Sequence, residues 1–348
     1  MTLRRITRDA RGLGPPAAVR MLHLGLGNFF RAHPAWYTER AGDGAGWGIA
    51  AFTGRRPDLA DALRAQDGLY TLIVRGPVAD ELAVVGSLSA VHAAREYEAW
   101  LGHCAHPEVA VISMTVTEAG YHRRRDGSLD LGHPAVRADV AALQRDRRAA
   151  VTTAPARLVA GLLARADAGA GAVAIVPCDN LPDNGAAVAR VMREFAAAVS
   201  PDAAAAVSGA ARYVSTMVDR ITPRATAADR ALVAARTGFD DACPVVTEPF
   251  HEWVLAGDFP VGRPAWESAG ARFVPDAAPH ERRKLWLLNG SHSLLAYAGS
   301  IRGHRTVSQA IADPECRGWV GQWWDAAGRH LGLPGPEIAG YRAALLER

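Results

Sequence analysis

The sequence predicts an α/β protein in which an open, largely parallel sheet is followed by a mainly helical region. Apolar runs that suit strands alternate with helical segments as far as residue 215, which is typical of a parallel sheet covered by helices. From residue 216 to 348 the pattern is mainly helical. The chain has 348 residues, 49% hydrophobic and 22% charged, which fits about two globular domains. We therefore expect domains at residues 15–215 and 216–348.

Each element follows from its local pattern. Strands are predicted at 18–24, 47–53, 69–74, 82–85, 109–116 and 172–176, and helices at 29–41, 57–65, 134–145, 154–168 and 183–198. The run VAVISMTV at 109–116 is mostly apolar without strict alternation, as expected at the centre of a parallel sheet. For the second region we predict a strand at 245–247 and helices at 227–235, 282–300, 306–312, 319–331 and 336–348.

Composition excludes several classes of function. The net charge of +3 is too small to indicate binding to nucleic acid or to an anionic membrane. No apolar run is long enough to span a bilayer, and no secretory signal is visible. The four widely spaced cysteines favour a reducing compartment, and we expect a cytoplasmic protein without a metal site.

Two glycines mark a candidate dinucleotide-binding turn. Gly25 and Gly27 follow the first predicted strand and precede a helix, so backbone N–H groups there can approach a pyrophosphate. Phe30 stands where a third glycine is usual, and the alternative is an ordinary turn. The second strand ends without a carboxylate. Asp58 is the nearest acid, and its neighbours Arg55 and Arg56 leave the choice between NAD and NADP open.

Lys284 is the single lysine among 38 arginines. A guanidinium keeps its proton while an amine can release one, so a lone lysine is a candidate general base. In an ideal α-helix of about 100° per residue, Glu281, His292 and Asn289 lie about 60°, 80° and 140° away from it, on one broad face. We expect this apolar helix to be largely buried, which favours the neutral amine. The alternative is a lysine that reaches solvent.

Seven segments carry a resemblance to a known family. They are HLGLGNFFRAH (23–33), QDGLYTL (66–72), TVTEAGY (115–121), PCDN (177–180) with Asn184-Gly185, TMVDRI (216–221), EPF (248–250) and Lys284-x4-Asn289-Gly-Ser-His292. In this combination and order the chain resembles the polyol-specific long-chain dehydrogenases, the group of mannitol dehydrogenase and fructuronate reductase.

The resemblance implies a Rossmann-type domain, a helical substrate domain and metal-independent hydride transfer with NAD, or alternatively NADP. It implies Lys284 as general base, with Asn180 and Asn289 donating to the developing alkoxide. It further implies that His292 and Asp219 bind substrate hydroxyls, His292 as part of the catalytic set, and that Glu281 relays protons. The residues expected to bind the cofactor are Gly25, Gly27, Asn28, Phe29, Arg31 and Asp58.

We expect an enzyme of carbohydrate metabolism that interconverts a sugar alcohol and a ketose, with mannitol and fructose as the leading pair. Mannonate and fructuronate are the alternative pair. Relatives continue beyond the position of Arg348, so we expect a C-terminally truncated helical domain. A rival of another class is therefore an inactive nucleotide-binding or assembly module. The protein is expected to be a monomer or a homodimer.

Overall fold

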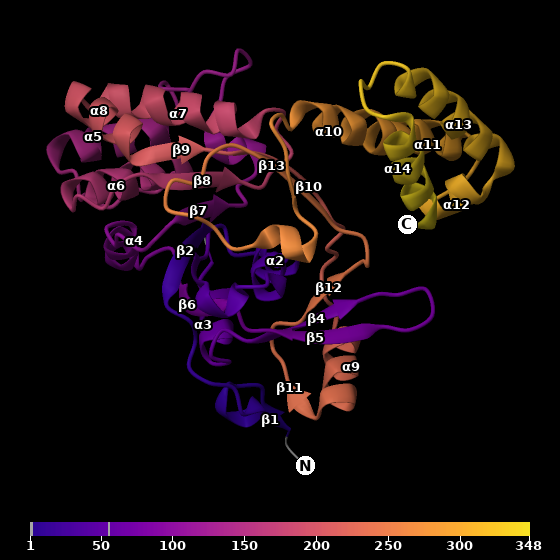
Figure 1. Cartoon of the computed structure of the whole chain (residues 1–348), viewed down its shortest axis with the longest axis horizontal. Helices are drawn as coiled ribbons and strands as arrows, with labels where there is room; N and C mark the ends of the chain where they lie inside the picture. Colours follow the sequence, from indigo (N-terminus) through magenta and orange to yellow (C-terminus); the bar gives the residue numbers. More distant parts are fainter. Residues whose placement is uncertain (1–2, 55) are drawn as a thin grey trace. The chain divides into compact units, whose positions relative to one another are not determined.

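The structure, a computed structural model, describes residues 3–54 and 56–348 (Figure 1). The chain divides into two compact units, Met1–Pro275 and Asp276–Arg348. The sequence predicted this division at residue 216 instead. Residues 216–275 contain five short strands or strand ends and one helix rather than mainly helix. Their strands have only two to five residues, too few to show a clear period.

The first unit is built on a six-stranded parallel sheet in the order β6-β3-β2-β7-β8-β9, which confirms the predicted fold class. This order is the 3-2-1-4-5-6 arrangement of dinucleotide-binding sheets, and it reverses between β2 and β7. The strands are β2 (Val19–Leu24), β3 (Gly48–Phe52), β6 (Leu88–His92), β7 (Val111–Met114), β8 (Val173–Pro177) and β9 (Ala211–Tyr213).

Helices cover both faces of the sheet, and each face has its own apolar core. Alternate residues of a strand serve opposite cores: Leu22 packs into one and Met21 into the other. Figure 1 shows α5, α6, α7 and α8 gathered beside β8 and β9. The helices of the first unit are α1 (Asn28–Ala32), α2 (Pro34–Arg40), α3 (Asp58–Arg64), α4 (Tyr97–Cys104), α5 (Pro134–Arg145), α6 (Ala154–Asp167), α7 (Asn184–Val199), α8 (Pro201–Ala210) and α9 (Ala227–Thr237).

Smaller sheets complete the first unit. β4 (Tyr70–Val74) pairs antiparallel with β5 (Glu81–Val85) and parallel with β12 (Val245–Thr247). β13 (Glu252–Ala256) lies between β10 (Ser215–Asp219) and β14 (Arg272–Phe273). β1 (Arg4–Arg5) pairs with β11 (Phe239–Asp240). Short 3-10 turns lie at Asp9–Arg11, Gly44–Gly46, Glu118–Tyr121 and Trp266–Ala269.

The second unit is helical. It contains α10 (Ala278–Arg283), a π-helical turn (Lys284–Asn289), α11 (Gly290–Ile301), α12 (Val307–Ala312), α13 (Pro314–Gly328) and α14 (Gly335–Glu347). The sequence predicted these helices but not the π-helical turn. Among the described residues, no helix is both long and apolar enough to cross a membrane.

A buried histidine joins β2 to β7 in the first unit. The Oγ1 of Thr115 donates to the Gly25 carbonyl at 2.7 Å, so the Nε2–H of His23 donates to Thr115 at 3.0 Å. The Nδ1 of His23 lies 2.9 Å from the Ser113 hydroxyl, within hydrogen-bond distance. Burial favours the uncharged ring and lowers the pKa of His23 to about 3.

We expect the protein to lose stability as the pH falls from about 7 to 4. The unfolded chain takes up protons on His23 and His251 near the ordinary pKa of about 6.5, whereas burial lowers their pKa values to about 3 and about 4 in the folded state. The unfolded state therefore binds more protons, and the loss for His23 is about 3 kcal/mol at pH 4. Urea unfolding at several pH values measures it. An unchanged pH dependence in His23→Gln would assign the effect to other groups.

Candidate active site

A hollow of about 690 Å³ lies at the carboxyl end of the parallel sheet, where the strand order reverses. This switch point is where open α/β sheets bind their ligands. The hollow is lined by the ends of β2, β3 and β7 and by the start of α6. The lining residues are Leu24, Gly25, Leu26, Thr53, Gly54, Arg56, Leu59, Thr115, Val116, Thr117, Gly120, His122, Thr152, Thr153, Ala154 and Arg157.

Gly25 makes the close approach of β2 and β7 at this edge. Its φ of +110° is a backbone conformation that glycine adopts readily and other residues rarely. An added Cβ would also lie 2.5 Å from the carbonyl oxygen of Thr115. The amides of Gly25 and Leu26 both donate to the Phe52 carbonyl, at 3.0 and 2.9 Å. Gly27 has an extended φ of −144° and caps α1, where a Cβ would meet only the Gly25 carbonyl at 3.6 Å.

We expect Gly25→Ala to destabilise the fold by about 1–3 kcal/mol and to weaken cofactor binding, because alanine is strained at this φ and clashes with Thr115. Gly27→Ala is the matched control for stability, since its Cβ has room within the fold. Thermal unfolding of both variants measures the loss of stability, and cofactor titration measures the loss of affinity in Gly25→Ala. Equal losses of stability in the two variants would contradict this account of the turn.

The other residues predicted around the turn stabilise its conformation and do not line the hollow. Arg31 is buried and donates to the carbonyls of Gly27 at 3.3 Å and Cys243 at 2.5 Å, and to the side chain of Asn28 at 2.8 Å. Phe29 stacks on His33 at 4.9 Å. These three side chains hold the turn and are absent from the described lining. α1 has only five residues, shorter than the predicted helix, because His33 and Pro34 start a new helix.

The acid predicted for the cofactor ribose is not among the described residues that line the hollow. Asp58 is exposed in the first turn of α3, and the described lining contains Arg56 but not Asp58. Arg55 lies outside the described residues.

Asn180 follows β8 in a loop that is fixed on both sides. The Tyr121 hydroxyl donates to Asp179, and the Leu181 amide donates to the same carboxylate at 3.0 Å. Burial raises the pKa of Asp179. Asn184 accepts from the Thr216 amide at 2.8 Å and donates to the Thr216 carbonyl at 3.1 Å, which ties the start of α7 to β10. Asn180 itself is exposed.

Asp219 ends β10 and is 5% exposed. Its neighbour Arg220 donates to the carbonyls of Ala32 at 2.5 Å and Glu248 at 3.2 Å and stacks over Trp36. Arg220 therefore has a structural role that joins three segments, including the EPF segment.

Lys284 begins the π-helical turn of the second unit, and Asn289 ends it. The amide of Gly290 donates to the carbonyl of Leu285, five residues back. Such turns are rare and are frequent at functional sites. A π turn holds one residue more than an α turn, which rotates later residues back by about 100°. Asn289 and His292 then lie about 40° and 20° on either side of Lys284, a narrower stripe than an ideal helix would make.

Two indoles of α13 donate hydrogen bonds to backbone carbonyls of this turn. The Nε1–H of Trp323 donates to the Trp286 carbonyl at 2.7 Å. Trp324 donates to the Leu287 carbonyl at 3.0 Å and to the Ser291 hydroxyl at 2.7 Å. Both contacted carbonyls lie inside the turn, so α13 sets the conformation on which the alignment of Lys284 depends.

We expect Trp324→Phe to lower stability by about 1 kcal/mol and to lower kcat more than it raises KM, because the ring stays while the donor to the π turn is lost. Trp319→Phe on the same helix is the control, because no hydrogen bond of its indole is among those described. Steady-state kinetics of both variants measure the effect. Equal kcat values would show that the indole donor does not position the turn.

The helix around Lys284 is less buried than predicted. Lys284 and Glu281 are half-buried, Asn289 and His292 are exposed, and Leu287 is buried. Only one side of a helix can pack against its neighbours, here α12 and α13, and the residues on other sides remain exposed.

One group of three potential metal ligands lies elsewhere among the described residues. His304, Asp313 and Cys316 place their ligand atoms within 4.8 Å of one another. Arg302 donates to Asp313 at 2.7 Å, and the other Asp313 oxygen accepts from the Glu315 amide at the start of α13. An ion pair and a helix cap explain this carboxylate, and we assign no metal to it.

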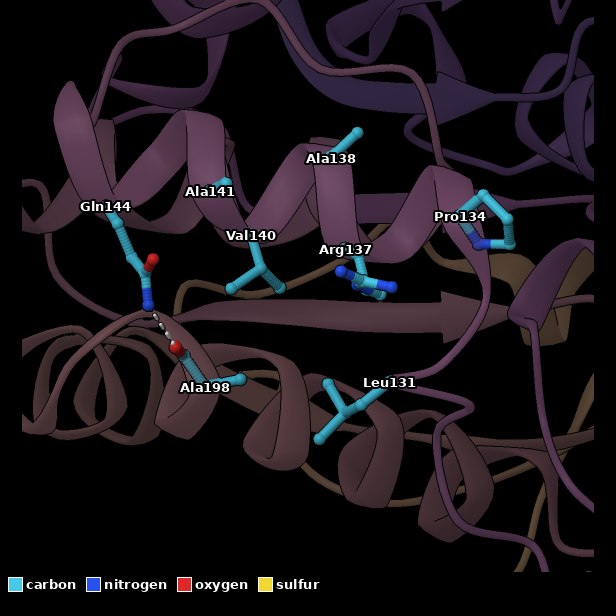
Figure 2. Close-up of a pocket in the computed structure, with 8 residues that line it drawn as sticks. All are labelled: Leu131, Pro134, Arg137, Ala138, Val140, Ala141, Gln144 and Ala198. Carbon is cyan, nitrogen blue, oxygen red and sulfur yellow. Dashed lines mark hydrogen bonds between the residues drawn. The ribbon is translucent and has the colours of Figure 1, made fainter.

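A second hollow, of about 560 Å³, lies between α5 and the end of α7 (Figure 2). Its walls are mainly apolar, with Arg137 as the charged side chain among the residues drawn. The Gln144 amide donates to the Ala198 carbonyl at 2.9 Å across it. These side chains indicate no catalytic role for the second hollow.

Several residues of the first hollow are not predicted from the sequence. Thr115 and Thr117 belong to the segment TVTEAGY without a role of their own, and Thr153 and Arg157 belong to none of the seven segments. The available signal was their position directly after the central strand or at the start of a helix, where parallel sheets place ligand contacts.

Comparison with known proteins identifies the family. The model of the mannitol dehydrogenase Rossmann domain matches residues 19–268, and that of the mannitol dehydrogenase C-terminal domain matches residues 276–348. The expectation that the C-terminal segment is missing is therefore not supported by this match. The chain spans 60% to 69% of the length of three relatives from Escherichia coli.

Individual relatives and solved structures point to the same family as the two domain models. D-mannonate oxidoreductase of Escherichia coli is 34% identical over 94% of this chain and 69% of its own. Mannitol 2-dehydrogenase of Aspergillus fumigatus is 34% identical over 94% and 67%. The Pseudomonas fluorescens mannitol 2-dehydrogenase ternary complex with NAD and D-mannitol matches with a TM-score of 0.88 at 33% identity, covering 99% of this chain and 73% of its own. A D-sorbitol dehydrogenase in substrate-free form matches with a TM-score of 0.89 at 33% identity, covering 99% and 74%. The chain belongs to the mannitol dehydrogenase family.

Proposed function

We propose that the chain is an NAD-dependent oxidoreductase that interconverts a sugar alcohol and a ketose, as in the mannitol and fructose pair. The observation that carries this proposal is the hollow at the switch point of a parallel sheet in dinucleotide-binding order. The glycine turn after β2 lies at the edge of this hollow, where parallel sheets place dinucleotides, so the residues present fit such a cofactor. Bound NAD supplies the nicotinamide ring that accepts a hydride from the alcohol carbon.

We assign the proton chemistry to Lys284. An alcohol must lose its hydroxyl proton as its carbon is oxidised, and Lys284 carries the single side-chain amine of the chain, which can take this proton in its neutral form. Asn180 and Asn289 donate side-chain N–H groups to the developing alkoxide. Asp219 and His292 bind further hydroxyls of the substrate, and Glu281 relays the proton from Lys284.

Cofactor binding uses the turn after β2. Gly25 sets the close approach of β2 and β7, Gly27 offers its backbone N–H, and Asn28, Phe29 and Arg31 keep the turn in place. Asp58 contributes charge from α3 without lining the hollow. The four cysteines are all buried and free, which supports a reducing compartment such as the cytoplasm.

A second candidate substrate pair is mannonate and fructuronate, which the relative named D-mannonate oxidoreductase supports. The test is the absorbance of reduced cofactor with purified protein, NAD or NADP, and mannitol, sorbitol, arabinitol or mannonate. We expect turnover with a polyol above that with mannonate. The reverse order would select the second pair, and no reduction with any of them would contradict an oxidoreductase of this class.

A further inference from the structure

One end of the switch-point hollow is positively charged. The residues there come from the loop after β3 and from the first turn of α6. Arg56 and Arg157 are the fully charged side chains of the described lining, and no carboxylate lies in that lining. Asp58, the acid closest to this loop in sequence, lies outside it. A site built for the free ribose hydroxyls of NAD places a carboxylate at the end of the second strand, and here that strand, β3, continues into Thr53 and Gly54.

Arg157 holds its charge at this wall without a carboxylate contact. Its Nη2 donates to the Ala94 carbonyl at 2.6 Å, and its guanidinium lies 5.9 Å from the Tyr97 ring. Among the described residues Nη1 has no partner. The nearby carboxylate of Asp139 is engaged by the amides of Thr152 and Thr153 at 3.1 and 2.8 Å. A half-buried cation whose charge is not matched by a contacting anion favours an anionic ligand.

Arg56 supplies the accessible part of the site. It is exposed in the loop after β3, and no ion pair is described for it. Thr53, three residues before it in sequence, is buried and accepts from the Ala94 amide at 3.1 Å. The start of the loop after β3 and the backbone that anchors Arg157 therefore meet at Ala94.

We propose that this end of the hollow is a subsite for the 2′-phosphate of a dinucleotide, so that the chain binds NADP(H) at least as well as NAD(H). Arg56 contacts the phosphate directly, and Arg157 contributes its charge from the wall. The proposal rests on the proposed function, because it assumes that the hollow binds a nicotinamide dinucleotide.

The test is direct binding, followed by the fluorescence of NADPH and NADH, with no substrate present. We expect NADPH to bind at least as tightly as NADH to the wild-type chain. Arg56→Ala should weaken NADPH about 10-fold or more and NADH by less than about 2-fold, since one charge-assisted contact is lost. Because Arg56 is exposed, its loss leaves the fold intact. Arg137→Ala, an exposed arginine of the second hollow, is the control and should change neither.

The outcomes separate the two proposals. NADH binding about 10-fold tighter than NADPH, or an equal loss of both in Arg56→Ala, would overturn the phosphate subsite and leave the proposed function standing. Binding of neither dinucleotide would overturn both. In support, adenosine 2′,5′-bisphosphate should compete with NADPH better than adenosine 5′-monophosphate, and the difference should shrink as salt is raised.

Discussion

Lys284→Met is expected to lower kcat by about 10²- to 10⁴-fold, the usual contribution of a general base. Methionine keeps the length and most of the volume of the side chain but takes no proton. The other cationic side chains that are always charged are arginines, which cannot replace an amine as base. Cofactor affinity should change little, because Lys284 is assigned to the substrate and not to the dinucleotide. Steady-state rates and cofactor titration measure the two effects separately.

Lys284→Arg decides whether the lysine acts as a base or as a fixed charge. It restores a cation at the same position and still cannot exchange a proton near neutral pH. We expect it to be as inactive as the methionine variant. Activity near that of the wild type in Lys284→Arg would show that a positive charge alone is required.

Asn180→Ala and Asn289→Ala are each expected to lower kcat by about 10²- to 10³-fold, the effect of removing one donor to an oxyanion. Asn184→Ala is the matched control. Its side chain is buried and makes hydrogen bonds with Thr216 in both directions, so its loss should lower the free energy of unfolding more than kcat.

The comparison is made by urea unfolding and steady-state kinetics of the three variants. A decrease in kcat confined to Asn184→Ala, with Asn180→Ala and Asn289→Ala active, would remove the two exposed asparagines from the proposed chemistry.

The parallel sheet was predictable because its strands are apolar runs between clear turns. β2, β3, β7 and β8 appear close to their predicted positions, and α5 at its predicted bounds. β6, α4 and α8 were missed. β6 (LSAVH) mixes apolar with small and polar residues, and α8 is an alanine-rich segment that directly follows α7 at Pro201. β9 and β13 are held in place by their neighbours in the sheets more than by their own sequence period.

The residues of the candidate site were predictable as a set of motifs, and their geometry was not. Composition alone distinguishes Lys284, because it is the single lysine of the chain. The π-helical turn that it begins depends on indoles almost 40 residues away in sequence, 37 between Trp324 and Leu287, and such a tertiary constraint leaves no local signal. The contribution of Arg157 to the hollow could not be predicted for a related reason. The start of α6 lies at the hollow because of the order in which the strands are arranged in the sheet, and the local sequence does not show that order.

The most direct test of the central claim is the fate of hydrogen from the substrate. Mannitol or mannonate, whichever is turned over faster, is supplied with every carbon-bound hydrogen replaced by deuterium, in ordinary water with NAD or NADP. The reduced cofactor is then analysed by mass spectrometry. The account predicts one deuterium on the reduced nicotinamide in the wild-type chain and almost none formed by Lys284→Met. No reduction of the cofactor, or reduced cofactor that carries no deuterium, would contradict it.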